Sequence, residues 1–213
     1  MAEYYAQWIP LFSYELLEDG TYEVSQGEEE LTGEIIIPAY YNGIAVTAIA
    51  DGAFDGCIGI TSIIMSDMIT YIGEGAFYGC INLESIVMSQ NVTVIMAYTF
   101  AGCSSLAYVE LPNGVTDIEA YAFAGSGIED IIIPSSVTYV YEYAFIDCDN
   151  LGVVALARTT EQGITLILPT AFEDNGYICF VVFDEDSYYD YYDYFEEELS
   201  GLEDYLQYVA YFA

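Results

Sequence analysis

The sequence is almost without basic residues. Lysine and histidine are absent, Arg158 is the single basic side chain, and 35 acidic residues bring the formal net charge to -34. A potential of this sign repels nucleic acid and anionic membranes and favours cations or basic partners. Direct nucleic-acid binding is therefore excluded. Solubility of a hydrophobic chain, adaptation to high salt and deliberate recoding of surface lysines are alternative explanations of the charge.

Targeting and membrane-spanning segments are also missing. The residues after Met1 contain neither a basic region nor the apolar stretch of 7–15 residues that a secretory signal needs. We therefore expect either a cytoplasmic protein or one from which a signal has been removed. The longest uncharged stretch, Ile35 to Ala50, contains Pro38 and Gly43, so no segment is expected to cross a membrane.

Residues for metal binding and catalysis are scarce. No C-x-x-C pair exists, and without histidine or lysine no ordinary side chain titrates near pH 7. No glycine-rich phosphate loop follows a strand, and neighbouring acids are expected by chance in so acidic a chain. The run Asp184-Glu185-Asp186 could offer oxygen atoms to calcium, but a solvated acidic helix face explains it better. We expect no enzyme, no cofactor and no metal.

The chain carries an internal repeat. Five phenylalanines, four of them preceded by alanine, recur every 22 or 23 residues, at Phe54, Phe77, Phe100, Phe123 and Phe145. A cysteine follows three residues later in four of the five copies, at Cys57, Cys80, Cys103 and Cys148. A threonine stands seven residues before each phenylalanine. This period is typical of a solenoid of stacked units. It predicts one column of phenylalanines, with the cysteines as small apolar fillers beside it.

Each cysteine position is followed by an L-x-x-L-x-L strand pattern, as in Leu106, Val109 and Leu111. Taken together, these motifs resemble the BspA-like (treponemal-type) leucine-rich repeats, whose unit is approximately L-x-x-I-x-I-P-x-x-V-T-x-I-G-x-x-A-F-x-x-C. The resemblance extends from about Glu34 to Leu168. It implies an α/β repeat fold, a right-handed leucine-rich-repeat solenoid with one parallel sheet. It also implies an extracellular or cell-surface protein used in adhesion.

The ends differ from the repeats, as the ends of a solenoid must, because an open terminal coil would expose its apolar face. Residues 1–34 are predicted to form an N-terminal cap with a β-hairpin between Phe12 and Ser25. Residues 35–168 are predicted to form about five repeats. Residues 169–213 are predicted to form a C-terminal cap with an acidic, tyrosine-rich helix that begins near Ser187 and ends near Gly201.

Two surfaces are candidates for recognition. The first consists of side chains that point outward from the predicted strands, a binding face made of Ile64, Val87, Tyr108, Glu110, Asp130 and Ile132. The second is an aromatic ladder two residues before successive phenylalanines, made of Tyr98, Tyr121 and Tyr143. The ladder could equally serve to stabilise the solenoid by stacking between coils.

The predicted function is a non-enzymatic protein-recognition or adhesion module that binds a protein or glycan ligand, with preference for a basic partner, through the strand face. The alternatives are a structural subunit that assembles into a filament or surface layer, and an engineered or recoded acidic scaffold. The expected caps favour recognition because they block end-on stacking. Whether the chain is a monomer or assembles is left open by the sequence.

Overall fold

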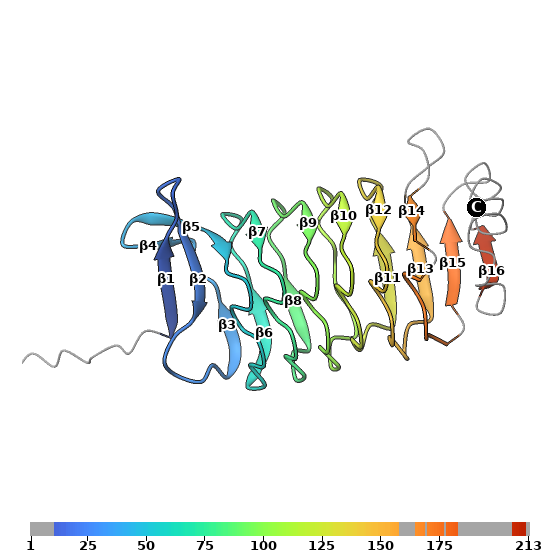
Figure 1. The fold of residues 1–213 in the computed structure, drawn as a ribbon, viewed down its shortest axis with the longest axis horizontal. Helices are drawn as coiled ribbons and strands as arrows, with labels where there is room; N and C mark the ends of the chain where they lie inside the picture. Colours follow the sequence, from blue (N-terminus) through green and yellow to red (C-terminus); the bar gives the residue numbers. More distant parts are fainter. Residues whose placement is uncertain (1–10, 158–164, 169, 177, 183–205, 212–213) are drawn as a thin grey trace, which may run out of the picture.

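The computed structural model describes residues 11–157, 165–168, 170–176, 178–182 and 206–211 of the chain. These residues form an elongated solenoid whose coils lie side by side along one axis (Figure 1). Every regular element among them is a strand. The helix predicted from Ser187 to Gly201 lies outside the described residues.

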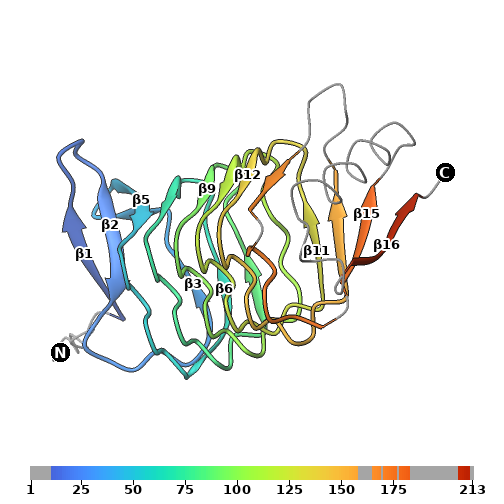
Figure 2. The same ribbon diagram turned by 45° about the vertical axis from the view of Figure 1, so that its right-hand side comes forward.

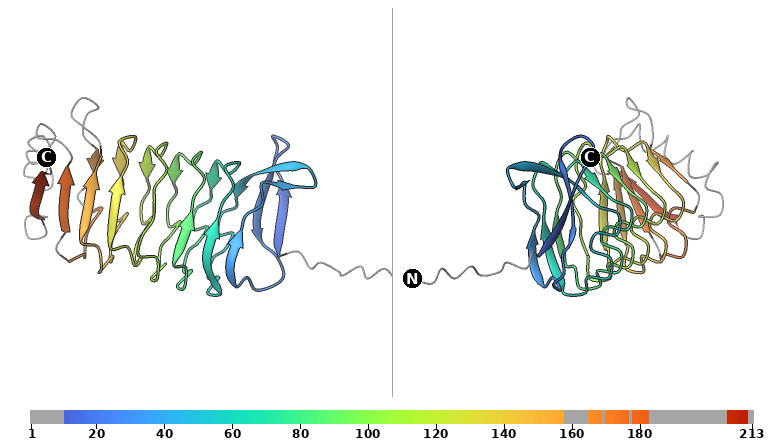
Figure 3. Two further views of the ribbon diagram at one scale, coloured as in Figure 1. Left: turned by 180° about the vertical axis from the view of Figure 1, so that it is seen from behind. Right: turned by 60° about the vertical axis from the view of Figure 1, so that its left-hand side comes forward.

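The N-terminal hairpin is present as predicted. Strands β1 (Phe12–Leu16) and β2 (Tyr22–Gln26) pair antiparallel. Gly20 adopts a φ of 84° in the turn, where a side chain would be strained. Strand β2 then pairs in parallel with β5 (Ile44–Ile49), so the hairpin stands against the first coil and covers its strand edge (Figure 3). A short strand, β4 (Tyr40–Tyr41), pairs antiparallel with the first two residues of β5.

The L-x-x-L-x-L segments pair in parallel from coil to coil along one face of the solenoid, called here the strand face. This face is divided into two sheets. The first contains β3 (Gly33–Ile36), β6 (Ile60–Ile64) and β8 (Ser85–Val87). The second contains β11 (Asp130–Ile133), β13 (Val153–Leu156), β15 (Ile178–Val182) and β16 (Leu206–Tyr211). Between them, residues 106–112 follow the same course without forming a strand.

A second line of parallel strands follows the Thr-x-Ile segments, so the prediction of one parallel sheet is wrong. In Figure 1 these strands lie along the upper rim, β7 (Tyr71–Ile72), β9 (Val94–Ile95), β10 (Asp117–Ile118), β12 (Tyr139–Val140) and β14 (Leu166–Ile167). β9, β10, β12 and β14 form one parallel sheet, whereas β7 pairs in parallel with β5. The threonine backbones bond from coil to coil, as where Thr116 N–H donates to the Thr93 carbonyl at 2.8 Å. β-Branched residues favour this extended geometry.

The segments that connect the two faces are turns, so the described part of the chain does not have the helical connections that an α/β repeat implies. Each of the five coils that contain Phe54 to Phe145 carries two residues with positive φ, for example Gly75 at 60° and Gly79 at 67°. A left-handed residue interrupts a right-handed helix, and two of them within five residues leave room only for turns. The chain therefore closes each coil tightly around the core (Figure 2).

The predicted column of phenylalanines forms the centre of the core. The rings of Phe54, Phe77, Phe100, Phe123 and Phe145 have no exposed surface and stack with centroids 5.0–5.6 Å apart. A sixth ring extends the column, because Phe172 stacks on Phe145 at 4.9 Å. Phe172 follows Thr165, Ile167 and Ala171 in the repeat's own register. The sequence prediction had assigned it to the C-terminal cap.

Candidate functional site

Four of the cysteines lie beside the phenylalanine column; the thiols of three of them bond to the preceding coil, and Cys57 Sγ donates to Gln26 Oε1 at 2.7 Å. Cys80, Cys103 and Cys148 Sγ donate to the carbonyl oxygens of Phe54, Phe77 and Phe123 at 3.0–3.2 Å. Asn175 takes the same place in the sixth coil and donates to the Phe145 carbonyl at 2.7 Å.

Burial in the apolar core makes these thiols poor nucleophiles. It raises the pKa of Cys57 to about 11 and that of Cys80 to about 12, and it raises the pKa of Cys103 and Cys148 as well. Protonated, buried thiols do not serve as metal ligands or catalytic groups at neutral pH. Among the described residues, no group of three or more His, Cys, Asp or Glu side chains could hold a metal ion.

The residues of the predicted binding face lie on the strand face, and most are open to solvent. Val87 is 58% exposed, Tyr108 54% and Ile132 49%, while Glu110 and Asp130 are also exposed. Ile64 is half-buried.

One further apolar residue was missed by the sequence analysis. Ile36 is 60% exposed and pairs in register with Ile64, which in turn pairs with Val87. The three side chains therefore form one apolar row across β3, β6 and β8. The signal was present in the sequence, because Ile36 precedes Pro38 as Ile132 precedes Pro134.

A groove opens where the strand face is interrupted. It has a volume of about 240 Å³ and is lined by Tyr108, Val109, Glu110, Leu111, Asn113, Ile132, Pro134, Ser135 and Ala157. Three of the predicted face residues, Tyr108, Glu110 and Ile132, thus share one concavity. The lining comes from residues 108–113, which do not form a strand, from β11 and the turn after it, and from Ala157 after β13.

The electrostatic environment of the strand face is uniformly negative. Glu84, Glu110, Glu129 and Asp130 are exposed on it. The chain's one basic side chain, Arg158, lies outside the described residues, so no described basic side chain neutralises these carboxylates. A groove with apolar walls and an acidic rim favours a partner that brings both apolar and basic side chains.

The predicted aromatic ladder, made of Tyr98, Tyr121 and Tyr143, is also present. Successive rings are stacked with centroids 5.0 Å apart. All three residues have a φ of 58–60°, in the left-handed region. Glycine occupies the same position in the two preceding coils, at Gly52 and Gly75, also with a φ of 60°.

The left-handed backbone of these tyrosines has an energetic cost. It is about 1–2 kcal/mol for a residue with a Cβ atom, whereas one stacked aromatic pair contributes about 0.5–1.5 kcal/mol beyond its buried area. Three strained residues form only two stacked pairs. Glycine, however, loses about 0.5–1 kcal/mol more backbone freedom on folding, so the net cost of tyrosine relative to glycine is about 0–1.5 kcal/mol per residue, which is comparable to the contribution of the stacked pairs.

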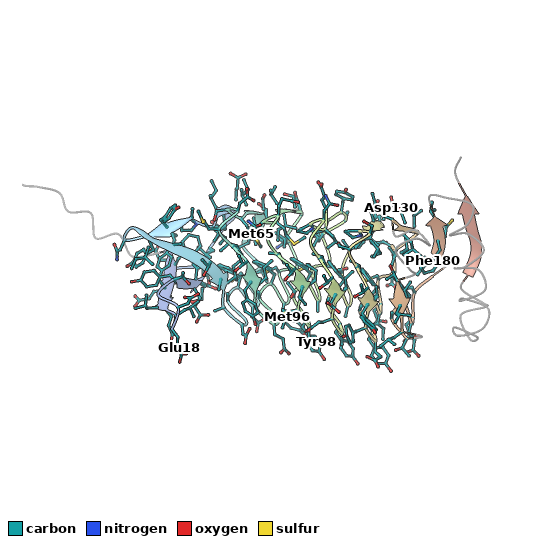
Figure 4. All side chains as sticks on the ribbon, turned by 90° about the horizontal axis from the view of Figure 1, so that it is seen from above. Glu18, Met65, Met96, Tyr98, Asp130 and Phe180 are labelled. Carbon is teal, nitrogen blue, oxygen red and sulfur yellow. The ribbon has the colours of Figure 1, made fainter. Side chains whose placement is uncertain are left out.

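The ladder stands among carboxylates on the side away from the strand face. Desolvation raises the pKa of the Tyr121 phenol, and the neighbouring Tyr98 and Tyr143 phenols and the carboxylates of Glu173 and Glu142 raise it further. Figure 4 places Tyr98 and Asp130 on opposite sides of the solenoid. The molecule thus presents two separate candidate surfaces, one apolar and grooved, the other aromatic.

No helix among the described residues has the length and apolar character of a membrane span. A search of curated proteins finds no match to the chain.

Three solved bacterial structures share the solenoid fold. A leucine-rich repeat protein of T. pallidum is 28% identical with a TM-score of 0.66, and the match covers 68% of this chain and 69% of that one. A leucine-rich cell surface protein of Faecalibacterium prausnitzii is 36% identical with a TM-score of 0.64, over 71% of this chain and 39% of that one. A leucine-rich repeat protein of Bacteroides ovatus is 28% identical with a TM-score of 0.68, over 84% of this chain and 50% of that one.

The chain thus spans half or less of the length of the last two proteins. A family model, the BspA type leucine-rich repeat region, matches residues 33–152 with six copies. This match covers more than half of the sequence and includes five of the six stacked phenylalanines. The chain belongs to the BspA type leucine-rich repeat family.

Proposed function

We propose that the protein is a non-enzymatic recognition module that binds a protein partner through its strand face, with the groove at residues 106–112 as the centre of contact. The single observation that carries this proposal is the convergence of Tyr108, Glu110 and Ile132 on one concavity. Exposed aromatic and apolar side chains around a pocket are typical of protein contacts, and small pockets concentrate the binding energy.

The apolar row extends the contact beyond the groove. Ile36, Ile64 and Val87 lie in register on adjacent paired strands, so a partner could bury several of them together. The acidic residues around them would steer a basic partner, with faster association at low salt. We also propose an extracellular or cell-surface location and a role in adhesion, since the F. prausnitzii relative is described as a cell surface protein.

A peptide display library panned against the whole protein tests this function. We expect the enriched peptides to combine apolar with arginine or lysine residues and to lose binding to Val87→Ser and Ile132→Ser. Matched controls are Leu166→Ser and Tyr139→Ser, because both residues are exposed on the opposite line of strands. Peptides that bind all four variants equally well, or that lose binding only to the controls, would show that the strand face is not the recognition surface.

A further inference from the structure

We propose that the tyrosine ladder is a second binding surface, and that its occupant is an arginine-bearing cationic segment of a partner protein. It is independent of the strand face, because Tyr98 and Asp130 lie on opposite sides of the solenoid (Figure 4). The inference goes beyond the recognition proposed for the groove and uses none of the groove's residues.

The first step is the presentation of the rings. Tyr98, Tyr121 and Tyr143 are fixed by their backbone and by stacking at 5.0 Å, so little conformational freedom is lost when a ligand binds. The ladder begins at Tyr98, because the preceding coil has Gly75 at the same position. Among the described residues, Tyr121 is the aromatic ring stacked on Tyr98, and the other face of Tyr98 is free of a ring partner. Tyr98 is also the most exposed of the three.

The second step is the charge around the rings. Glu142 and Glu173 lie close enough to the Tyr121 phenol to act on its ionisation. On the side of Tyr98, Glu119 Oε2 accepts a hydrogen bond from the Ala97 N–H at 3.1 Å, which anchors a carboxylate beside the first ring of the ladder. Glu74, next to Gly75, is exposed. Aromatic rings are therefore bordered by carboxylates along the whole ladder.

The stacked tyrosine rings and the carboxylates around them together favour a cationic ligand. The face of a tyrosine ring attracts a cation electrostatically, and carboxylates at the border add direct pairing. Arginine suits the site better than lysine, because its planar guanidinium stacks on a ring while its N–H groups bond to a carboxylate. Two steps of 5.0 Å separate the first ring from the third. An extended peptide rises about 3.3 Å per residue, so a segment of about three or four residues spans the ladder.

The third step is the backbone. The left-handed turn accepts glycine at Gly52 and Gly75, yet three successive coils carry tyrosine in the same strained conformation. The stacked pairs help to offset this strain, and the same backbone holds three rings in register where a ligand can reach them.

The test is a fluorescence titration of labelled octa-arginine and octa-lysine with the full chain at about 0.15 M salt. The ladder is removed in the triple variant Tyr98→Gly, Tyr121→Gly, Tyr143→Gly, which keeps the net charge and suits the backbone. A triple Tyr→Phe variant keeps the rings and removes the hydroxyl groups. The control is Tyr40→Ser, which removes an exposed tyrosine of β4 that belongs to neither the ladder nor the strand face.

We expect the triple glycine variant to bind octa-arginine about tenfold more weakly, with a smaller loss for octa-lysine. The phenylalanine variant and the Tyr40→Ser control should bind as the unchanged protein does. Equal affinity of the glycine variant would overturn the proposal, since it would leave only the general attraction of a polyanion. A loss of binding to a neutral oligosaccharide, without loss for octa-arginine, would also overturn it and would indicate a glycan surface.

Discussion

The strained tyrosines predict that glycine stabilises the protein more than alanine at position 121, which is the opposite of the usual order. At an ordinary position alanine is more stable than glycine by about 0.5–1 kcal/mol, because glycine loses more backbone freedom on folding. Tyr121 has a φ of 60°, where a Cβ atom costs about 1–2 kcal/mol. Both Tyr121→Ala and Tyr121→Gly remove the contacts with Tyr98 and Tyr143. Only the glycine variant also removes the backbone strain at position 121.

The difference between the two variants isolates the backbone contribution. We expect Tyr121→Gly to be more stable than Tyr121→Ala by up to about 1.5 kcal/mol, the strain of about 1–2 kcal/mol less the usual glycine penalty of about 0.5–1 kcal/mol. Urea unfolding measures it as a higher midpoint at equal slope. Tyr108 is the matched control, because it is exposed and has no positive φ. There alanine should be the more stable. If alanine is also the more stable at position 121, the strain argument fails.

Three further predictions concern the core and the charge. Phe100→Ala should destabilise the protein by about 3–5 kcal/mol, because the ring is fully buried between two others, and urea unfolding measures this. The pKa of Cys80 is raised to about 12 in the folded state, so the folded protein holds this proton where the unfolded chain releases it. The free energy of unfolding should therefore decrease as pH rises above about 9, and it should decrease less steeply in the Cys80→Ala variant. The thermal midpoint should rise when salt is increased from about 0.01 M to 0.15 M, because the net charge of -34 is screened, and light scattering should show a monomer at both concentrations.

The core could be predicted from the sequence because the period alone determines it. Each coil must place its largest ring above the ring before it, so Phe54 and the four phenylalanines that follow it at fixed spacing had to form one column. The cysteines could be assigned to the core for the same reason. Their bonds to phenylalanine carbonyls could not be predicted, because hydrogen-bond geometry depends on the exact offset between coils.

The elements that the sequence analysis missed have sequence patterns that are too short to recognise or that depart from the regular spacing. Phe172 follows Phe145 at a longer spacing than the other phenylalanines, since residues are inserted between the two coils, and Asn175 replaces the cysteine. The strands opposite the strand face are two residues long, as in β10, which is too short for an alternating pattern to be recognised. The positive φ of Tyr98, Tyr121 and Tyr143 could not be predicted, because tyrosine does not ordinarily indicate a left-handed turn.

Both candidate surfaces lie in coils that depart from the regular repeat. The exposure of Val87 and Ile132 follows from strand alternation and was predictable, whereas the groove beside Ile132 was not, because much of its lining comes from residues 108–113, which do not form a strand. The ladder exists because tyrosine replaces glycine in three coils. A regular solenoid offers a flat, repeated surface that does not distinguish one coil from the next. Binding at a particular place requires a local difference, and the coils between Tyr98 and Tyr143 contain both of the differences described here.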